Sequence, residues 1–305
     1  MDHYGKLAAL GTACCWTVTA LSFEAAGRRV GSLPVNLIRL VIAFLLLTAF
    51  GWIVRGIPLP TDASGRAWLW LAVSGVVGFS IGDLCLFRAF LLVGARTAML
   101  VMSLVPPMAA VTGWLLLGER LTVVDLAGMA LTVGGVAWVV SERAAHAEPT
   151  EPDPAPSQPP RRPALGVLLA LGGAAGQATG LVLSKVGMRD YDAFAATQIR
   201  VIAGIASLCV LFTLIQIWPR VIAALRSRPA MARISLGAFF GPFLGVSFSL
   251  VAVQHTEAGV AATIMSIVPV LIIAPAIVLF RERVTLRAVL GSVIAVAGVA
   301  LLFLT

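Results

Sequence analysis

A few charged side chains stand inside long apolar stretches of this chain, where each of them could do chemistry. Asp83 is the only carboxylate clearly inside such a stretch, and Arg39 and Arg200 lie six or seven residues into two others. A carboxylate in apolar surroundings can take up a proton, which would suit proton exchange. The alternative is that Arg88, five residues further on, simply neutralises it. Each of these two arginines could bind an anionic group, or it could reach the lipid headgroups or form an ion pair with a neighbouring helix.

Two serine–proline motifs mark points where a helix cannot continue regularly. Ser103 precedes Pro106 by three residues, and Ser266 precedes Pro269 by the same distance. A proline inside a helix removes one backbone hydrogen bond and clashes with the preceding turn. In lipid the freed carbonyl needs a partner, so such breaks belong against protein or a water-filled cavity. These four residues are therefore candidates for the lining of a binding cavity, and a simple kink for packing is the alternative.

Trp16 and Gln177 complete the candidate binding residues. They stand at equivalent places, 161 residues apart, near the middle of two apolar stretches. Trp16 could stack on a flat ligand or could fill the core, because its ring serves both purposes. Gln177 brings an amide into the same place of the second stretch.

The elements that must position these residues are transmembrane helices. Hydrophobic residues make up 59% of the chain and charged residues 12%, whereas a soluble domain is about 25% charged. A spanning helix needs about 20 apolar residues. Polar breaks divide the chain into ten such segments: 5–25, 33–54, 67–90, 97–118, 122–141, 164–184, 193–217, 234–254, 258–280 and 286–304. We therefore expect an all-α polytopic membrane protein with ten transmembrane helices.

An internal repeat organises the ten segments. Residues 142–163 form an acidic linker with seven prolines, which divides the chain into two five-helix repeats at 1–141 and 164–305. With a shift of 163 residues, 12 of 38 positions are identical between 103–140 and 266–303. Because each repeat has an odd number of helices, the second enters the membrane from the opposite side. Two inverted repeats are the architecture of alternating-access carriers, which bind their substrate between the repeats.

Other repeated residues have structural interpretations. The triplets GER at 118–120 and RER at 281–283 predict the hairpin between the fourth and fifth helix of each half, where Thr122 or Thr285 can cap the next helix. We assign Glu119, Arg120, Glu282 and Arg283 to this hairpin and not to ligand binding. Two aligned G-x-x-x-G motifs favour close helix packing; their glycines are Gly78, Gly82, Gly241 and Gly245.

These motifs together resemble one known family. Ten spans in two halves, Trp16 in the first helix, Arg39 in the second, and S-x-x-P followed by ERLT or ERVT in both halves are similar to EamA-type members of the drug/metabolite transporter superfamily. The resemblance implies a secondary carrier that exports small metabolites or drugs. The chain departs from the family pattern at Gln177, where a tryptophan would repeat Trp16, and at Glu24, whose counterpart is Lys185. The preference for Arg over Lys is typical of GC-rich bacteria, and a bacterial source suggests the inner membrane as the location.

Two other functions are open at this point, namely an intramembrane lipid-processing enzyme that uses Asp83 with Arg39, and a passive channel. No phosphate-binding loop or nucleophile constellation is found in the sequence, and His3, His146 and His255 are isolated. We therefore expect no enzymatic activity, no cofactor and no metal. The expected partners are a small-molecule substrate and the lipid bilayer, without nucleic acid, and the chain would act as a monomer or homodimer.

The orientation of the chain in the membrane is open as well. On the side of the N-terminus we count six basic residues, and on the other side fourteen. The positive-inside rule then places both termini outside, whereas the family resemblance implies cytoplasmic termini.

Overall fold

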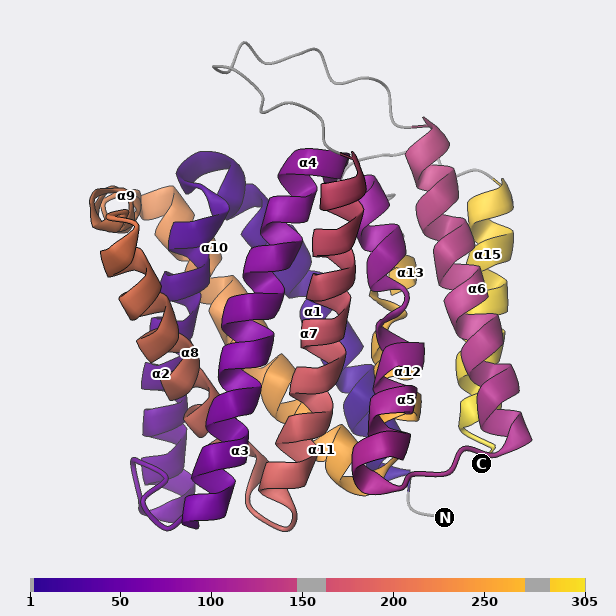
Figure 1. Ribbon diagram of the computed structural model, residues 1–305, viewed down its shortest axis with the longest axis horizontal. Coiled ribbons are helices and arrows are strands. Elements are labelled where there is room, and N and C mark those ends of the chain that lie inside the picture. Colours follow the sequence, from indigo (N-terminus) through magenta and orange to yellow (C-terminus); the bar gives the residue numbers. More distant parts are fainter. Residues whose placement is uncertain (1–2, 147–162, 272–285, 305) are drawn as a thin grey trace.

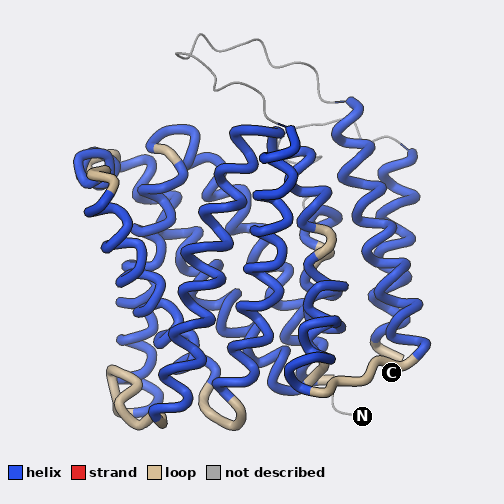
Figure 2. The backbone as a smooth tube through the Cα atoms, in the orientation of Figure 1, coloured by secondary structure: helices blue, strands red, loops and turns tan. Residues whose placement is uncertain are grey.

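The computed structural model describes residues 3–146, 163–271 and 286–304. All regular elements in this part are helices, and they stand side by side in one bundle with loops at its two ends (Figures 1 and 2). Within these three ranges, seven helices are long and apolar enough to cross a membrane: Tyr4–Gly27, Ser32–Arg55, Gly65–Leu86, Val123–Ser141, Ala164–Met188, Ala193–Leu214 and Arg228–His255. The predicted class of a multi-pass helical membrane protein is confirmed. The number ten stays a prediction, because the ninth segment lies partly outside the described residues.

The helices follow the predicted segments with two differences. The first half contains α1 (Tyr4–Val30), α2 (Ser32–Arg55), α3 (Gly65–Gly75), the π-helix η1 (Val76–Gly82), α4 (Asp83–Met102), α5 (Val105–Leu117) and α6 (Val123–His146). The second half contains α7 (Pro163–Met188), α8 (Ala193–Leu214), α9 (Trp218–Leu225), α10 (Arg228–Ala238), η2 (Phe239–Gly245), α11 (Val246–His255), α12 (Ala258–Met265), α13 (Val268–Leu271) and α15 (Leu286–Leu302). The prediction of a break between two helices at 91–96 was wrong, because α4 is helical there. At the upper end of Figure 1, α4 connects the column of α3 to that of α5. The short helix α9 was not predicted.

The two serine–proline motifs interrupt their helices as predicted. A two-residue turn, Ser103 and Leu104, separates α4 from α5, and a turn at the equivalent Ser266 and Ile267 separates α12 from α13. Pro106 then lies in the first turn of α5, where its missing N–H has no partner to lose. Both halves are therefore broken at the same place in the repeat.

A second repeated irregularity was not predicted. The third helix of each half contains a π-helical segment, and these begin at Val76 and Phe239, 163 residues apart. Each segment carries one of the G-x-x-x-G motifs. A methyl group at Gly176 of α7 would lie 2.9 Å from the Cα of Gly82 in η1, and one at Gly245 in η2 would lie 2.7 Å from the ring of Trp16 on α1. The predicted packing role of the glycines is thus confirmed. Through these glycines, each π-helix packs against the first helix of the opposite half.

The first helices of the two halves run in opposite directions. The start of α1 lies at the end of α11, since a methyl group at Gly5 would approach His255 to 3.0 Å. The end of α7 lies at the same place, because Lys185 Nζ donates to the carbonyl of Thr256 at 2.6 Å. At the other end of the bundle, Val30 of α1 and Leu169 of α7 line a common cavity. This is the arrangement that inverted repeats require.

The loop before α6 is fixed by its own side chains and by the other half. Thr122 Oγ1 accepts from the backbone N–H of Asp125 at 3.1 Å, while the Asp125 carboxylate accepts from the Thr122 N–H at 2.9 Å, so the predicted cap at Thr122 is confirmed. Glu119 accepts from Lys185 Nζ at 2.7 Å and from the N–H of Ala258 at 2.9 Å. One side chain of the first half therefore holds both the end of α7 and the start of α12.

Candidate functional site

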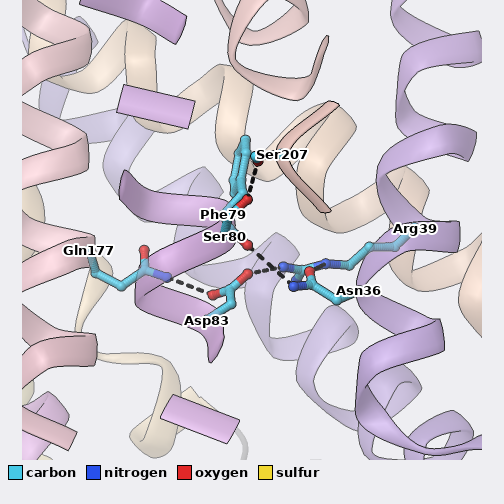
Figure 3. A network of polar contacts seen from close by, with 7 residues as sticks. All are labelled: Asn36, Arg39, Phe79, Ser80, Asp83, Gln177 and Ser207. Carbon is cyan, nitrogen blue, oxygen red and sulfur yellow. Dashed lines mark hydrogen bonds and ion pairs between the residues drawn. The ribbon is translucent and has the colours of Figure 1, made fainter. Parts of the chain in front are cut away.

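A cluster of polar side chains lies inside the bundle where four helical segments of the two halves meet (Figure 3). The first half supplies residues from α2 and from the junction of η1 with α4, and the second half supplies residues from α7 and α8. Asp83 begins α4 directly after the π-helix, and its side chain is 8% exposed. The end of the π-helix η1 thus places the Asp83 carboxylate in the centre of the cluster.

The carboxylate of Asp83 is held by both halves. Arg39 forms an ion pair with its Oδ2, and Gln177 Nε2 donates to its Oδ1 at 3.0 Å. Arg39 is itself oriented by Asn36, because Arg39 Nε donates to Asn36 Oδ1 at 2.8 Å. Asn36 Nδ2 in turn donates to the carbonyl of Phe79 in η1 at 3.2 Å. The chain of contacts therefore runs from α2 through α4 to α7 (Figure 3).

Arg200 is the second guanidinium beside this carboxylate. The residue is 5% exposed, and its guanidinium carbon lies 4.9 Å from the centre of the Phe79 ring. Its charge attracts that of Asp83, but its Nε has no hydrogen-bond partner within the described ranges. Nearby, Ser80 and Ser207 share a hydrogen bond of 2.5 Å that joins η1 to α8. Among the described side chains, the cluster thus contains two cations and one anion.

A cavity of about 600 Å³ lies at the end of the bundle where α1 turns into α2. Its lining is mostly apolar and comes from both halves: Val30, Gly31, Ser32, Leu33, Pro34, Leu84, Cys85, Arg88, Leu169, Leu211, Ile215, Ile217 and Arg220. Leu84 and Cys85 follow Asp83 directly on α4, so the wall of the cavity and the polar cluster share this helix. Two exposed arginines, Arg88 and Arg220, add positive charge to the lining.

The structure brings together four of the nine candidate residues, which are Arg39, Asp83, Gln177 and Arg200. The suggestion that Arg88 neutralises Asp83 was wrong, because Asp83 pairs with Arg39 while Arg88 is exposed and lines the cavity.

The other five candidates lie elsewhere. Trp16 packs against Gly245, Ser103 and Pro106 are buried at the helix break, and Ser266 donates to the carbonyl of Thr263 at 2.7 Å. Pro269 is the second residue of the short α13, and its side chain is outside the described part, as are Glu282 and Arg283. Arg120 of the first hairpin is exposed.

Several residues of the cluster escaped the sequence analysis. Asn36 and Ser80 each stand three residues before a charged member of the cluster, Arg39 and Asp83, and such a spacing places two side chains on one face of a helix. A search for polar residues one turn away from buried charges would have found both of them.

This architecture defines the class of protein. Two repeats of opposite orientation that meet around buried polar side chains are typical of membrane transporters. The model of the EamA-like transporter family matches residues 3–141 and 164–304, so the chain belongs to this family, as the motifs predicted. The chain is a multi-pass membrane transporter, and its family consists of transporters and not of enzymes.

The fold is also that of known structures. Solved structures include 29 chains that match significantly. One of them, titled "Crystal structure of protein", aligns with a TM-score of 0.78 over all of this chain and 98% of its own, at 19% sequence identity. A search of curated proteins finds no significant match.

Proposed function

We propose that this transporter is a secondary active carrier that exports small metabolites or drugs from a bacterial cell by alternating access. The observation that carries the proposal is the polar cluster, because Asp83 is bound at the same time by Arg39 of the first half and Gln177 of the second. A rearrangement of one half against the other must change these contacts. A bound solute that interacts with the same groups can therefore favour one arrangement over the other.

The two ends of the bundle support alternating access. At one end Glu119 ties the first half to Lys185 and to the backbone of Ala258, both in the second half. At the other end the cavity of about 600 Å³ lies between the two halves. A closed end and an open end are what a carrier presents in one of its two states.

Coupling to protons is part of the proposal, and Asp83 is its candidate. Protonation would remove the negative charge that attracts Arg39, and so weaken the contact between α2 and α4. Uptake and release of one proton would in this way be linked to the arrangement of the helices. The variant Asp83→Asn, which imitates the protonated state, should still exchange substrate for substrate but should no longer be driven by a pH gradient.

Counterflow in proteoliposomes tests the carrier function. Vesicles loaded with an unlabelled solute should accumulate the same labelled solute transiently, because a carrier returns faster with a bound substrate. A passive channel would let the label equilibrate without this overshoot. An enzyme would alter the compound chemically, which mass spectrometry of the recovered solute would reveal, and either result would refute the proposal.

A further inference from the structure

The guanidinium of Arg200 is buried without a full set of hydrogen bonds. The residue is 5% exposed and its Nε has no partner in the described part of the chain. Buried polar atoms are nearly always hydrogen-bonded, and a buried charge without a partner is costly. An arginine retained in this state needs an explanation, and an anion that binds there transiently is one.

The single carboxylate of the cluster is already committed to other groups. Asp83 Oδ2 is paired with Arg39 and Oδ1 accepts from Gln177. Within the described residues the cluster therefore carries one positive charge in excess, and Arg200 is the cation without an ion pair. One added negative charge would balance the cluster.

The surroundings of Arg200 restrict the kind of anion. One face of the guanidinium is covered by the ring of Phe79, while a terminal nitrogen faces Gly78, which has no side chain there; a methyl group at Gly78 would lie 3.4 Å from this nitrogen. Access is therefore along the edge of the guanidinium, which matches a planar carboxylate in two-point contact. Arg200 does not itself line the cavity. The apolar wall of the cavity begins on α4 at Leu84, one residue after Asp83, and includes Leu211, which lies about 16 Å beyond Arg200 along α8. A small organic acid with an apolar body could pass along this wall and reach Arg200 with its charged end.

We infer that Arg200 binds the anionic group of the transported substrate, and that this substrate is a small apolar carboxylate. The inference rests on the proposed carrier function. The carboxylate approaches the free Nε of Arg200, while Arg39 stays with Asp83. Binding supplies the missing negative charge, so the loaded cluster is neutral when the two halves move.

The test compares carboxylates with their uncharged amides. Hexanoate with hexanamide, and benzoate with benzamide, are matched in size and apolar area. The wild type and the variants Arg200→Met and Arg200→Lys are purified in detergent, with Arg226→Met as a control, since Arg226 is exposed at the end of α9. Thermal unfolding followed by tryptophan fluorescence reports binding, and counterflow of labelled hexanoate reports transport.

We expect the carboxylates, and not the amides, to raise the unfolding temperature of the wild type and of Arg226→Met. Arg200→Met should bind hexanoate about tenfold more weakly or worse, as expected for the loss of a hydrogen bond between charged groups. Its own unfolding temperature should be unchanged or higher without ligand, because the variant loses an unpaired buried charge. A merely structural arginine would instead give a less stable protein. Arg200→Lys should keep part of the binding, because it retains the charge.

The other outcomes separate the two proposals. The inference is wrong, and the carrier function remains, in any of three cases. Amides are exchanged as well as carboxylates, or no carboxylate raises the unfolding temperature of the wild type, or Arg200→Met still prefers carboxylates to amides. If sodium chloride alone gives the full shift and hexanoate adds nothing, a resident inorganic anion occupies Arg200 and the substrate assignment falls. Binding of hexanoate without counterflow of any solute would refute the carrier function.

Discussion

Removal of the one carboxylate in the polar cluster should destabilise the folded protein more than removal of either arginine. Asp83→Asn leaves the charges of Arg39 and Arg200 together, without a compensating anion among the side chains that the structure describes. Arg39→Met leaves Asp83 with its hydrogen bond from Gln177 and with the attraction of Arg200. Arg200→Met leaves the pair of Asp83 and Arg39 intact. The three variants therefore differ in charge balance although each removes one ionic side chain.

The magnitudes follow from burial. The side chains of Arg39 and Asp83 are 16% and 8% exposed, so the range for buried pairs applies. Asp83→Asn should lower the free energy of unfolding by about 3–5 kcal/mol, the cost of breaking a buried ion pair. Arg39→Met should cost about 1.5–3 kcal/mol, as for lost charged hydrogen bonds. Arg200→Met should lie within about 1 kcal/mol of the wild type, because relief of an unpaired charge offsets the lost contact with Phe79.

Equilibrium unfolding in mixed micelles, followed by tryptophan fluorescence, measures this order. A difference of about 3 kcal/mol corresponds to roughly two decades in the unfolding constant, which is well resolved. The double variant of Asp83→Asn with Arg39→Met should recover part of the loss, because it removes one of the two uncompensated cations. The charge argument is refuted if Arg200→Met is the most damaging of the three, or if the double variant loses the full sum of the single costs.

Three further predictions concern contacts outside the cluster. Gly176→Ala should cost about 1–3 kcal/mol in unfolding experiments, because its methyl group would meet the backbone of η1 at 2.9 Å, whereas Gly134→Ala, with open space around it, should be neutral or stabilising. Glu119→Ala should destabilise the protein more than Glu119→Gln, since glutamine can still accept a hydrogen bond from the start of α12, and the exposed Arg120→Gln serves as the neutral control. Burial, and next the hydrogen bond to a neighbouring carboxylate, raise the pKa of Tyr191 to about 12 from 10.0. Its contribution to stability should therefore be complete below pH 10 and be lost as the pH rises from 10 to 12, and Tyr191→Phe should remove this loss in a pH titration of the unfolding midpoint.

The features that could be predicted from the sequence are those that depend on a few neighbouring residues, and several of them occur in both repeats. Pro106 interrupts a helix wherever the helix lies, and the second half repeats the break at Ser266. The cap at Thr122 needs only the threonine hydroxyl and the backbone N–H three residues further on. The positions of the helices could be predicted from the lengths of the apolar segments, because a helix must be long enough to cross the apolar core of the bilayer.

The partners within the cluster could not be predicted in the same way. Gln177 and Asp83 are 94 residues apart, and their contact depends on how each helix is rotated about its axis. Arg88 was a candidate partner by sequence proximity, but five residues correspond to a rotation of about 140° around a helix, which directs its side chain elsewhere. The π-helices were missed because one extra residue per turn leaves the apolar pattern of the segment almost unchanged.

The two repeats differ at the polar cluster, and this difference agrees with the proposed substrate, which has one charged end and one apolar end. Gln177 of the second repeat contacts Asp83 of the first. The residues at the equivalent positions of the opposite repeats are Trp16 and Val246, which are apolar. Trp16 packs on Gly245, next to Val246, as Gln177 lies next to Gly82. In the proposed carrier, the scaffold that would move is therefore nearly symmetric, while the groups that would meet a solute are polar on one side and apolar on the other. A carrier that bound two equal charges, or none, would gain nothing from this divergence, whereas an organic acid with one charged end would use both sides.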